Sequence, residues 1–184
     1  MHIHILSLAL ALLNLIPSSS THTIALPPSS QSCPSPSSFT LRSITYLRYE
    51  VSPPFSSPQP NTTQLVFELE NGASGVSTGC SVQNVMAADG QWADDSGIWH
   101  ACVDRSITIG DRSYPVKTSA HFDWDAWRLS VNQTWACDES VTITQSFAST
   151  LAPTCTENKT GSQYIKECTV PDIVITATSE NSML

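Results

Sequence analysis

The sequence predicts an all-β protein: a single small antiparallel β-barrel or sandwich stapled by disulfide bonds. Three observations support this prediction. β-Branched and aromatic runs recur between clusters of Gly, Pro, Asn and Asp. No window shows sustained apolar residues at helical spacing, and four of the six cysteines form two local pairs within the strand-like runs. At 184 residues the chain is long enough for one core, and no internal repeat is evident.

The expected strands are short and follow one another closely. Apolar and polar residues alternate most clearly in residues 129–135, as is typical of a strand with one packed face and one solvated face. The folded domain is expected to cover residues 39–179, followed by a short tail at 180–184. The predicted strands are residues 41–51, 64–69, 98–103, 119–124, 129–135, 141–147, 164–170 and 173–178.

The first residues predict export from the cell. Residues 5–16 (ILSLALALLNLI) form an apolar run that is too short to span a bilayer and is followed by Pro17 and three serines. We interpret residues 1–20 as a secretory signal peptide, with an uncleaved anchor as the alternative. The mature protein is therefore expected to be secreted and extracellular, without membrane association after cleavage. Residues 21–38 are rich in Ser and Pro and are expected to form a flexible lead.

An even number of cysteines in an exported chain indicates disulfide bonds. We favour two local pairs, because each closes a loop between neighbouring predicted strands, and the two remaining cysteines then form a third pair. The predicted pairs are Cys80 with Cys102, Cys155 with Cys168, and Cys33 with Cys137. No two cysteines have the close spacing of zinc ligands, so we expect neither a metal nor another cofactor.

The charge balance excludes some partners. Sixteen acidic residues against eight basic ones give a net charge of −8, and the basic residues are scattered. Nucleic acid and anionic membranes are therefore poor partners, because both require a basic surface. Sequons at Asn61, Asn132 and Asn158 are candidate N-glycosylation sites, which agrees with a secreted protein.

The order of strands and cysteines resembles a known family. The segments that carry the resemblance are ITYLRYEV (44–51), LVFELENG (65–72), GCS (79–81), WHAC (99–102), HFDWD (121–125), TITQSFASTLAPTC (142–155) and YIKECTVPDIVITATS (164–179). Over residues 39–179 the chain is similar to the fungal major Alternaria allergen family, the Alt a 1-like proteins. The resemblance implies a secreted fungal β-barrel protein, an allergen or effector that engages plant defence proteins or the cell wall, with no settled enzymatic activity. It also implies the two local cysteine pairs.

The remaining cysteines depart from the family pattern. In the family's prototype an N-terminal cysteine joins two subunits, and Cys33 stands in that position, whereas Cys137 has no counterpart. An internal bond between Cys33 and Cys137 would remove the link between subunits. A homodimer therefore stays open as an alternative.

Partner binding is the function that these observations favour. We expect a secreted, non-catalytic protein that binds a host extracellular protein or a cell-wall component. The loop of residues 89–97 lies between Cys80 and Cys102, and a clamped loop loses less entropy on binding. We therefore predict that Trp92 in this loop contacts the partner, since Trp supplies a large contact area. The opposite interpretation is that Trp92 folds back onto the strands.

Two other functional classes are weighed against partner binding. A carbohydrate-binding module would use tryptophan faces, for which Trp92, Trp124 and Trp127 are the candidates, whereas Trp99 and Trp135 are expected in the core. A secreted hydrolase is the weaker alternative, because no G-x-S-x-G motif is present. The carboxylates that a glycosidase would need are expected to be solvated, and no catalytic residue is predicted. The carboxylate pairs considered are Asp94 with Asp95 and Asp123 with Asp125.

Overall fold

A computed structural model of the chain describes residues 38–52, 61–87, 89–95, 97–136, 142–176 and 179–183. All of them belong to one compact unit, Ser32–Leu184, and every regular element among them is a strand, as predicted. No helix in this part of the chain is long and apolar enough to cross a membrane. The predicted signal peptide, the lead up to residue 37, Cys33 and Cys137 lie outside the described residues, so their roles stay predictions.

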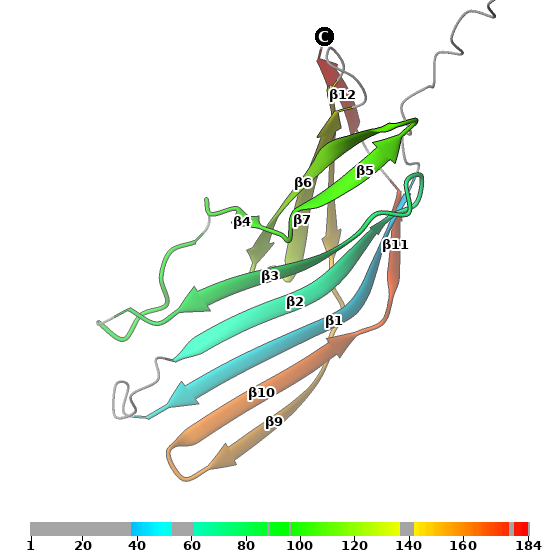
Figure 1. Cartoon of the computed structure of the whole chain (residues 1–184). Coiled ribbons are helices and arrows are strands. Elements are labelled where there is room, and N and C mark those ends of the chain that lie inside the picture. Colours follow the sequence, from blue (N-terminus) through cyan, green and yellow to red (C-terminus); the bar gives the residue numbers. More distant parts are fainter. Residues whose placement is uncertain are drawn as a thin grey trace, which may run out of the picture. The chain divides into compact units, whose positions relative to one another are not determined.

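The first of two sheets is antiparallel and has β1 at its centre (Figure 1). Its strand order is β3-β2-β1-β10-β9. β11 pairs with the start of β1, and β10 pairs with the rest of that same edge. The strands are β1 (Ser38–Val51), β2 (Thr62–Asn71), β3 (Ser77–Val85), β9 (Thr154–Thr160), β10 (Gln163–Val170) and β11 (Ile173–Thr176).

The second sheet is also antiparallel, with the order β12-β8-β7-β6-β4 and with β5 paired to β6. Along these pairings neither sheet closes on itself, so the described residues form a sandwich of two open sheets and not a closed barrel. The strands are β4 (His100–Ala101), β5 (Arg105–Ile109), β6 (Arg112–Asp123), β7 (Arg128–Ala136), β8 (Thr142–Thr150) and β12 (Ser179–Met183).

The main hydrophobic core lies between the inner faces of the two sheets. Phe39 of β1 stacks on Phe147 of β8 with 4.9 Å between ring centroids, which joins the two layers directly. A buried polar contact accompanies this packing, because Asn71 Nδ2 donates a hydrogen bond of 2.8 Å to Gln133 Oε1. Gln133 in turn donates to the hydroxyl of Thr118. These satisfied polar groups fix how the sheets align without leaving a buried donor unpaired.

A β-bulge in β1 decides which of its side chains face inward. Ser43 and Ile44 together lie opposite the single residue Phe67 of β2, and Ser43 has a φ of 51°. Before the bulge the odd-numbered residues, such as Leu41, are buried; after it the even-numbered residues, such as Tyr46, take that face. The extra residue thus reverses the alternation of the strand halfway along its length.

Both local cysteine pairs that the sequence predicted form disulfide bonds. Cys80 of β3 is bonded to Cys102, which follows β4, so this bond links the first sheet to the second. Cys155 and Cys168 lie directly opposite each other on β9 and β10 and are also bonded. The four described cysteines are therefore structural, and the core packs around them.

The strand predictions were correct in kind but incomplete in extent. The structure adds β3, β5 and β9, extends β6 by seven residues toward the N-terminus, and reduces the predicted strand at 98–103 to the two residues of β4. The expected tail at 180–184 overlaps Ser179–Met183, which forms β12, pairs in register with β8 and ends one edge of the second sheet. Such a polar segment can pair as a strand because the backbone hydrogen bonds between strands do not depend on its side chains.

Candidate functional site

The candidate site is a cavity of about 540 Å³ that we call the cleft. Its floor is the inner face of the first sheet, where β1, β2, β3 and β10 contribute polar side chains. One wall is the segment after β3, and the end wall is the turn between β6 and β7. The lining residues are Tyr46, Arg48, Thr63, Asn84, Trp92, Ala93, Asp94, Asp95, His121, Phe122, Asp123, Trp124, Asp125, Trp127, Tyr164 and Lys166.

The floor follows from strand register. Arg48 of β1 lies opposite Thr63 of β2 on one side and opposite Lys166 of β10 on the other, and directly paired residues share a face of the sheet. Because the bulge at Ser43 turns the even-numbered residues inward, Tyr46 and Arg48 reach the cleft side by side along the strand. No local sequence pattern indicates Arg48, Thr63 or Lys166, because only the pairing of three distant segments brings them together.

Trp92 lies in a folded segment and not in an open loop, and its contact with a partner stays a prediction. It forms an isolated antiparallel bridge with Met86, and the neighbouring Ala93 N donates to Val85 O at 3.1 Å. The side chain is half-buried, with the Arg48 guanidinium carbon 5.0 Å from its ring centroid. This contact is a cation–π interaction, which holds the indole against the floor of the cleft.

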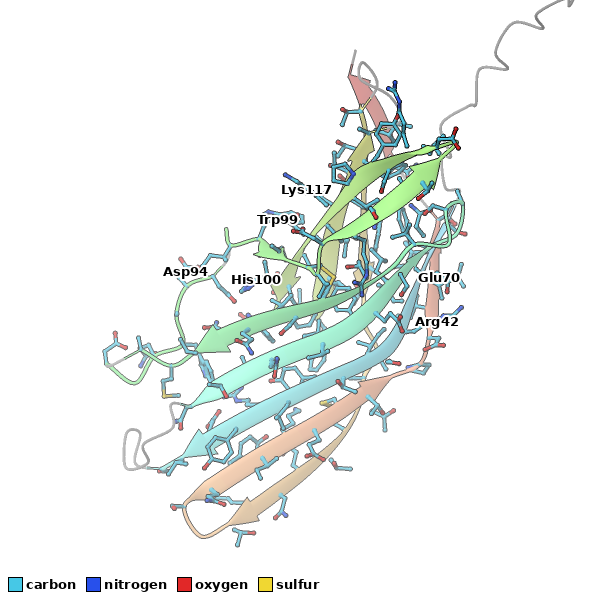
Figure 2. The ribbon with its side chains drawn as sticks, viewed as in Figure 1. Arg42, Glu70, Asp94, Trp99, His100 and Lys117 are labelled. Atoms are coloured by element: carbon cyan, nitrogen blue, oxygen red, sulfur yellow. A yellow bond between two sulfur atoms is a disulfide. The ribbon has the colours of Figure 1, made fainter. Side chains whose placement is uncertain are left out.

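A hydrogen bond joins the side wall of the cleft to its end wall. Trp124 Nε1 donates to Asp95 Oδ2 at 2.6 Å, so the segment that leads from β3 to β4 is tied to the turn between β6 and β7. Asp94, the neighbour of Asp95, is visible on that segment in Figure 2. The far end of the segment is fixed by the disulfide between Cys80 and Cys102. The wall is therefore anchored at both ends and in its middle.

The end wall is a tight turn that presents two indole rings. Asp123 Oδ1 accepts hydrogen bonds from the backbone N–H groups of Asp125 and Ala126, which stabilises the turn. Trp127 has a φ of 53°, a conformation that is unfavourable for a bulky residue and is retained only where the surroundings enforce it. Its ring packs on Tyr46 with 4.9 Å between centroids, so the strained backbone places an aromatic face at the cleft.

Thr63 on the floor of the cleft is 5% exposed, and its Oγ1 is buried and has no hydrogen-bond partner. His121 Nε2 is also buried and unpaired, but the His121 ring packs on Trp99 with 5.8 Å between centroids, on the face of β6 opposite the buried Phe122. Buried polar groups are normally satisfied, because leaving one unpaired costs about 1–3 kcal/mol. Such groups mark places where a ligand can supply the missing partner.

The basic residues of the cleft are paired with glutamates. The Lys166 ammonium lies 3.1 Å from Glu157, and the hydrogen bond between them raises the pKa of Lys166 and lowers the pKa of Glu157. Burial acts to lower the pKa of Arg48, but the hydrogen bond and charge of Glu50 outweigh burial, so this pKa is raised. Both cations therefore stay charged across the physiological pH range and have their counter-ions beside them.

The acidic pairs considered for a glycosidase both line the cleft, although they come from different segments. Asp95 accepts from Trp124 and Asp123 accepts from the turn backbone, so both carboxylates hold the walls in place. Among the described residues no group of three or more His, Cys, Asp or Glu side chains is arranged to hold a metal ion.

The other residues singled out from the sequence lie elsewhere. Trp135 is 2% exposed and belongs to a second apolar cluster, as expected for a core residue, whereas the expectation that Trp99 is buried was wrong, since it is 43% exposed. Trp99 precedes the short edge strand β4 (Figure 2), and its exposed ring packs on His121 of β6 with 5.8 Å between centroids.

The three sequons differ in accessibility. Asn61 is 4% exposed, and its amide bonds both the N–H and the carbonyl of Val51. Nδ2 of Asn61 is therefore buried and already donates a hydrogen bond, and a glycan at Asn61 stays a prediction. Asn132 is half-buried on β7 and Asn158 is exposed on the edge strand β9, so glycans at these two positions stay predictions.

No family model matches the chain, and no curated protein matches it significantly. Two solved structures from Alternaria alternata are similar to it. A crystal structure of the allergen Alt a 1 aligns with a TM-score of 0.41 and 17% sequence identity, covering 80% of this chain and 95% of that one. A second crystal structure of the major allergen Alt a 1 aligns with a TM-score of 0.39 and 15% identity, covering 79% and 96%. Both structures bear the name of the family that the sequence resembles.

Proposed function

We propose that this chain is a secreted, non-catalytic binding protein, and that the cleft receives a host extracellular protein or a cell-wall component. The observation that carries the proposal is the convergence of six aromatic side chains on one cavity. They are Tyr46 of β1, Trp92 of the segment after β3, Phe122 of β6, Trp124 and Trp127 of the turn after β6, and Tyr164 of β10. Aromatic groups that line a concave site are typical of binding surfaces, where they supply most of the contact area.

The cleft is organised before any ligand arrives. The bond between Trp124 and Asp95, the contact between Arg48 and Trp92, and the disulfide at the base of the wall all limit the freedom of the lining. A site whose side chains are already ordered loses less entropy on binding. The disulfide bonds also suit an oxidising extracellular compartment.

Binding has more support than hydrolysis. A glycosidase needs one carboxylate to act as an acid and another to act as a base or nucleophile. In the cleft the hydrogen bonds of Asp95 and Asp123 are used to join the walls and to stabilise a turn. These contacts give the carboxylates a role in positioning the aromatic side chains.

A retention experiment with matched tryptophan variants tests the proposal. The mature oxidised chain is immobilised and exposed to plant extracellular fluid and, separately, to insoluble cell-wall material. We expect wild-type protein to retain a partner and Trp92→Ala to weaken retention by about 1–3 kcal/mol, since the indole is a large contact in the cleft.

The control is Trp99→Ala, the same substitution at an exposed tryptophan that does not line the cleft. Both variants should keep the β-sheet circular dichroism spectrum of the wild type. Equal retention by wild type and Trp92→Ala, or equal loss in Trp92→Ala and Trp99→Ala, would show that the cleft is not the binding site.

A further inference from the structure

We propose that the ligand of the cleft is a short oligosaccharide of amino sugars, bound through its ring faces, hydroxyl groups and protonated amines. This inference rests on the proposed function and selects one class of cell-wall component. Four properties of the site support it, namely its length, its aromatic faces, its unpaired threonine hydroxyl and its charge.

The site is long enough for more than one sugar ring. A second cavity of about 780 Å³ lies along the ends of β1, β9 and β10, and it shares Arg48 and Tyr164 with the cleft. Gly161 and Ser162 of the turn between β9 and β10 line its far end. The shared lining makes the two cavities neighbours along one groove, which suits an extended chain better than a single compact molecule.

The aromatic rings and the unpaired hydroxyl group together suit a sugar. A pyranose ring has an apolar C–H face that packs on the face of an indole or phenol ring, and it carries hydroxyl groups around its rim. In the cleft, the half-buried rings of Trp124 and Trp127 supply such faces, while Thr63 Oγ1 on the floor is buried without a partner. A ligand hydroxyl can satisfy this group, which an apolar ligand cannot do.

Charge selects an amino sugar over a neutral one. The two cations of the cleft, Arg48 and Lys166, are paired with Glu50 and Glu157. By contrast, the hydrogen bonds to Asp95 and Asp123 come from neutral donors, an indole N–H and backbone N–H groups. The aromatic end of the cleft therefore keeps negative charge beside indole faces, and this combination attracts an ammonium group.

Titration of the full mature oxidised chain with three tetrasaccharides tests the inference. Tryptophan fluorescence and calorimetry are used to compare β-1,4-linked oligomers of glucosamine, N-acetylglucosamine and glucose. We expect the glucosamine oligomer to bind on the order of tenfold more tightly than the other two, and this advantage should shrink at high salt. Equal affinity for all three oligomers, or no binding of any, overturns the inference.

Two variants separate the charge from the hydroxyl contacts. Asp95→Asn keeps an oxygen acceptor for Trp124 but removes the charge, so it should lower affinity for the glucosamine oligomer by roughly tenfold and leave the acetylated one nearly unchanged. The control Asp111→Asn changes an exposed aspartate in the turn between β5 and β6 and should have no effect. Unchanged glucosamine binding in Asp95→Asn contradicts the charge argument.

Thr63→Val tests the unpaired hydroxyl with a side chain of similar shape. If Oγ1 awaits a ligand, the variant should be at least as stable as wild type, because an unsatisfied buried group is removed, yet it should bind the oligomer about fivefold more weakly. Reduced stability with unchanged affinity would contradict the inference by showing a purely structural role.

A tetralysine peptide provides the last comparison. It carries ammonium groups without sugar rings, so binding as tight as that of the glucosamine oligomer would also overturn the inference. The outcome is distinguishable from failure of the proposed function: retention of an extracellular protein that depends on Trp92, without binding of any oligosaccharide, leaves the binding proposal standing and removes only the amino-sugar ligand.

Discussion

The inner face of the first sheet has two halves that differ sharply although they belong to the same strands. In the half that packs against the second sheet, β1 contributes Phe39 and Leu41, both fully buried. Farther along the same face it contributes Arg48 and Glu50, which are only half-buried and form an ion pair. Figure 1 shows the far ends of β1, β2 and β10 extending beyond the ribbons of the second sheet.

The difference shows that the covering layer decides the composition of the inner face. Under the second sheet the face is dry, so each side chain gains by burying apolar area. Beyond the second sheet, water and ligands reach the same face, so a charged side chain there carries only a small desolvation free energy. Tyr46 lies at the border, in the core on one side and at the cleft on the other. The cleft therefore lies where the first sheet is no longer covered by the second sheet.

The largest expected effect comes from breaking the covered half. Phe147→Ala removes a buried ring that stacks on Phe39 across the two layers and should lower the free energy of unfolding by about 3–5 kcal/mol. Urea denaturation followed by tryptophan fluorescence measures this loss. Tyr164→Ala in the open half is the matched comparison and should cost far less; equal losses would show that the two halves do not differ in packing.

The second largest effect comes from freeing the wall of the cleft. Replacing both Cys80 and Cys102 by Ser should cost about 2–4 kcal/mol, because the bond closes a loop and links the two sheets. Replacing Cys155 and Cys168 should cost less, since their sequence separation is 13 residues against 22 and their strands are already paired. Non-reducing urea titrations of the two double variants give the order, and a reversed order contradicts the argument.

A smaller loss of stability is expected when a hydrogen-bonding side chain of the open half is removed. Asn61→Ala removes the amide that bonds both backbone groups of Val51 and should cost about 1–3 kcal/mol. Protein made in a host without N-glycosylation isolates this effect, and hydrogen exchange at the Val51 amide reports it locally. Asn158→Ala, at the exposed sequon, is the control and should change neither the free energy of unfolding nor the hydrogen exchange of the Val51 amide. An Asn61→Ala protein of full stability would show that the hydrogen bonds from Asn61 to Val51 are dispensable.

The smallest effect on folding is expected from the charges of the open half. Lys166→Met should leave the unfolding midpoint almost unchanged, since exposed ion pairs contribute little. It should raise the pKa of Glu157 toward the ordinary glutamate value, because the hydrogen bond from Lys166 is what lowers it. NMR titration of the Glu157 carboxyl carbon measures the shift.

The sign of this pH dependence follows from the lowered pKa. A carboxyl group with a depressed pKa contributes stability above its ordinary pKa and loses that contribution as the pH falls through the folded value. At acidic pH the free energy of unfolding of Lys166→Met should therefore depend slightly less on pH than that of the wild type. Lys159→Met serves as the control, and a Glu157 pKa that moves equally in both variants would contradict a specific pair.

Sequence patterns were sufficient for the fold class and insufficient for several strands. Residues 44–51 contain several β-branched and aromatic residues, and residues 129–135 alternate between apolar and polar, so both segments were recognised. By contrast, β9 (TCTENKT) is polar and almost wholly exposed, and it is a strand because β10 and the bond from Cys155 to Cys168 hold it at the sheet edge. Its propensity alone does not predict this.

The site was predicted only in part for a similar reason. Composition drew attention to Trp92, Trp124 and Trp127, and all three do line the cleft. Arg48 and Lys166 gave no signal, because a charged residue inside an alternating strand looks like a solvated one. Their position on the inner face depends on where the second sheet ends and on the bulge in β1, and neither is encoded in a local pattern.

Because of the bulge at Ser43, the number of residues in β1 decides which of its side chains face the cleft. If β1 lost the bulge but kept all of its residues, simple alternation would turn Leu47 and Tyr49 toward the cleft and move Tyr46 and Arg48 to the opposite face. The strand order would not change. A chain of this architecture without the bulge therefore presents the same binding groups only if it is one residue shorter at this position, and an alignment that places no gap there equates residues on opposite faces of the sheet.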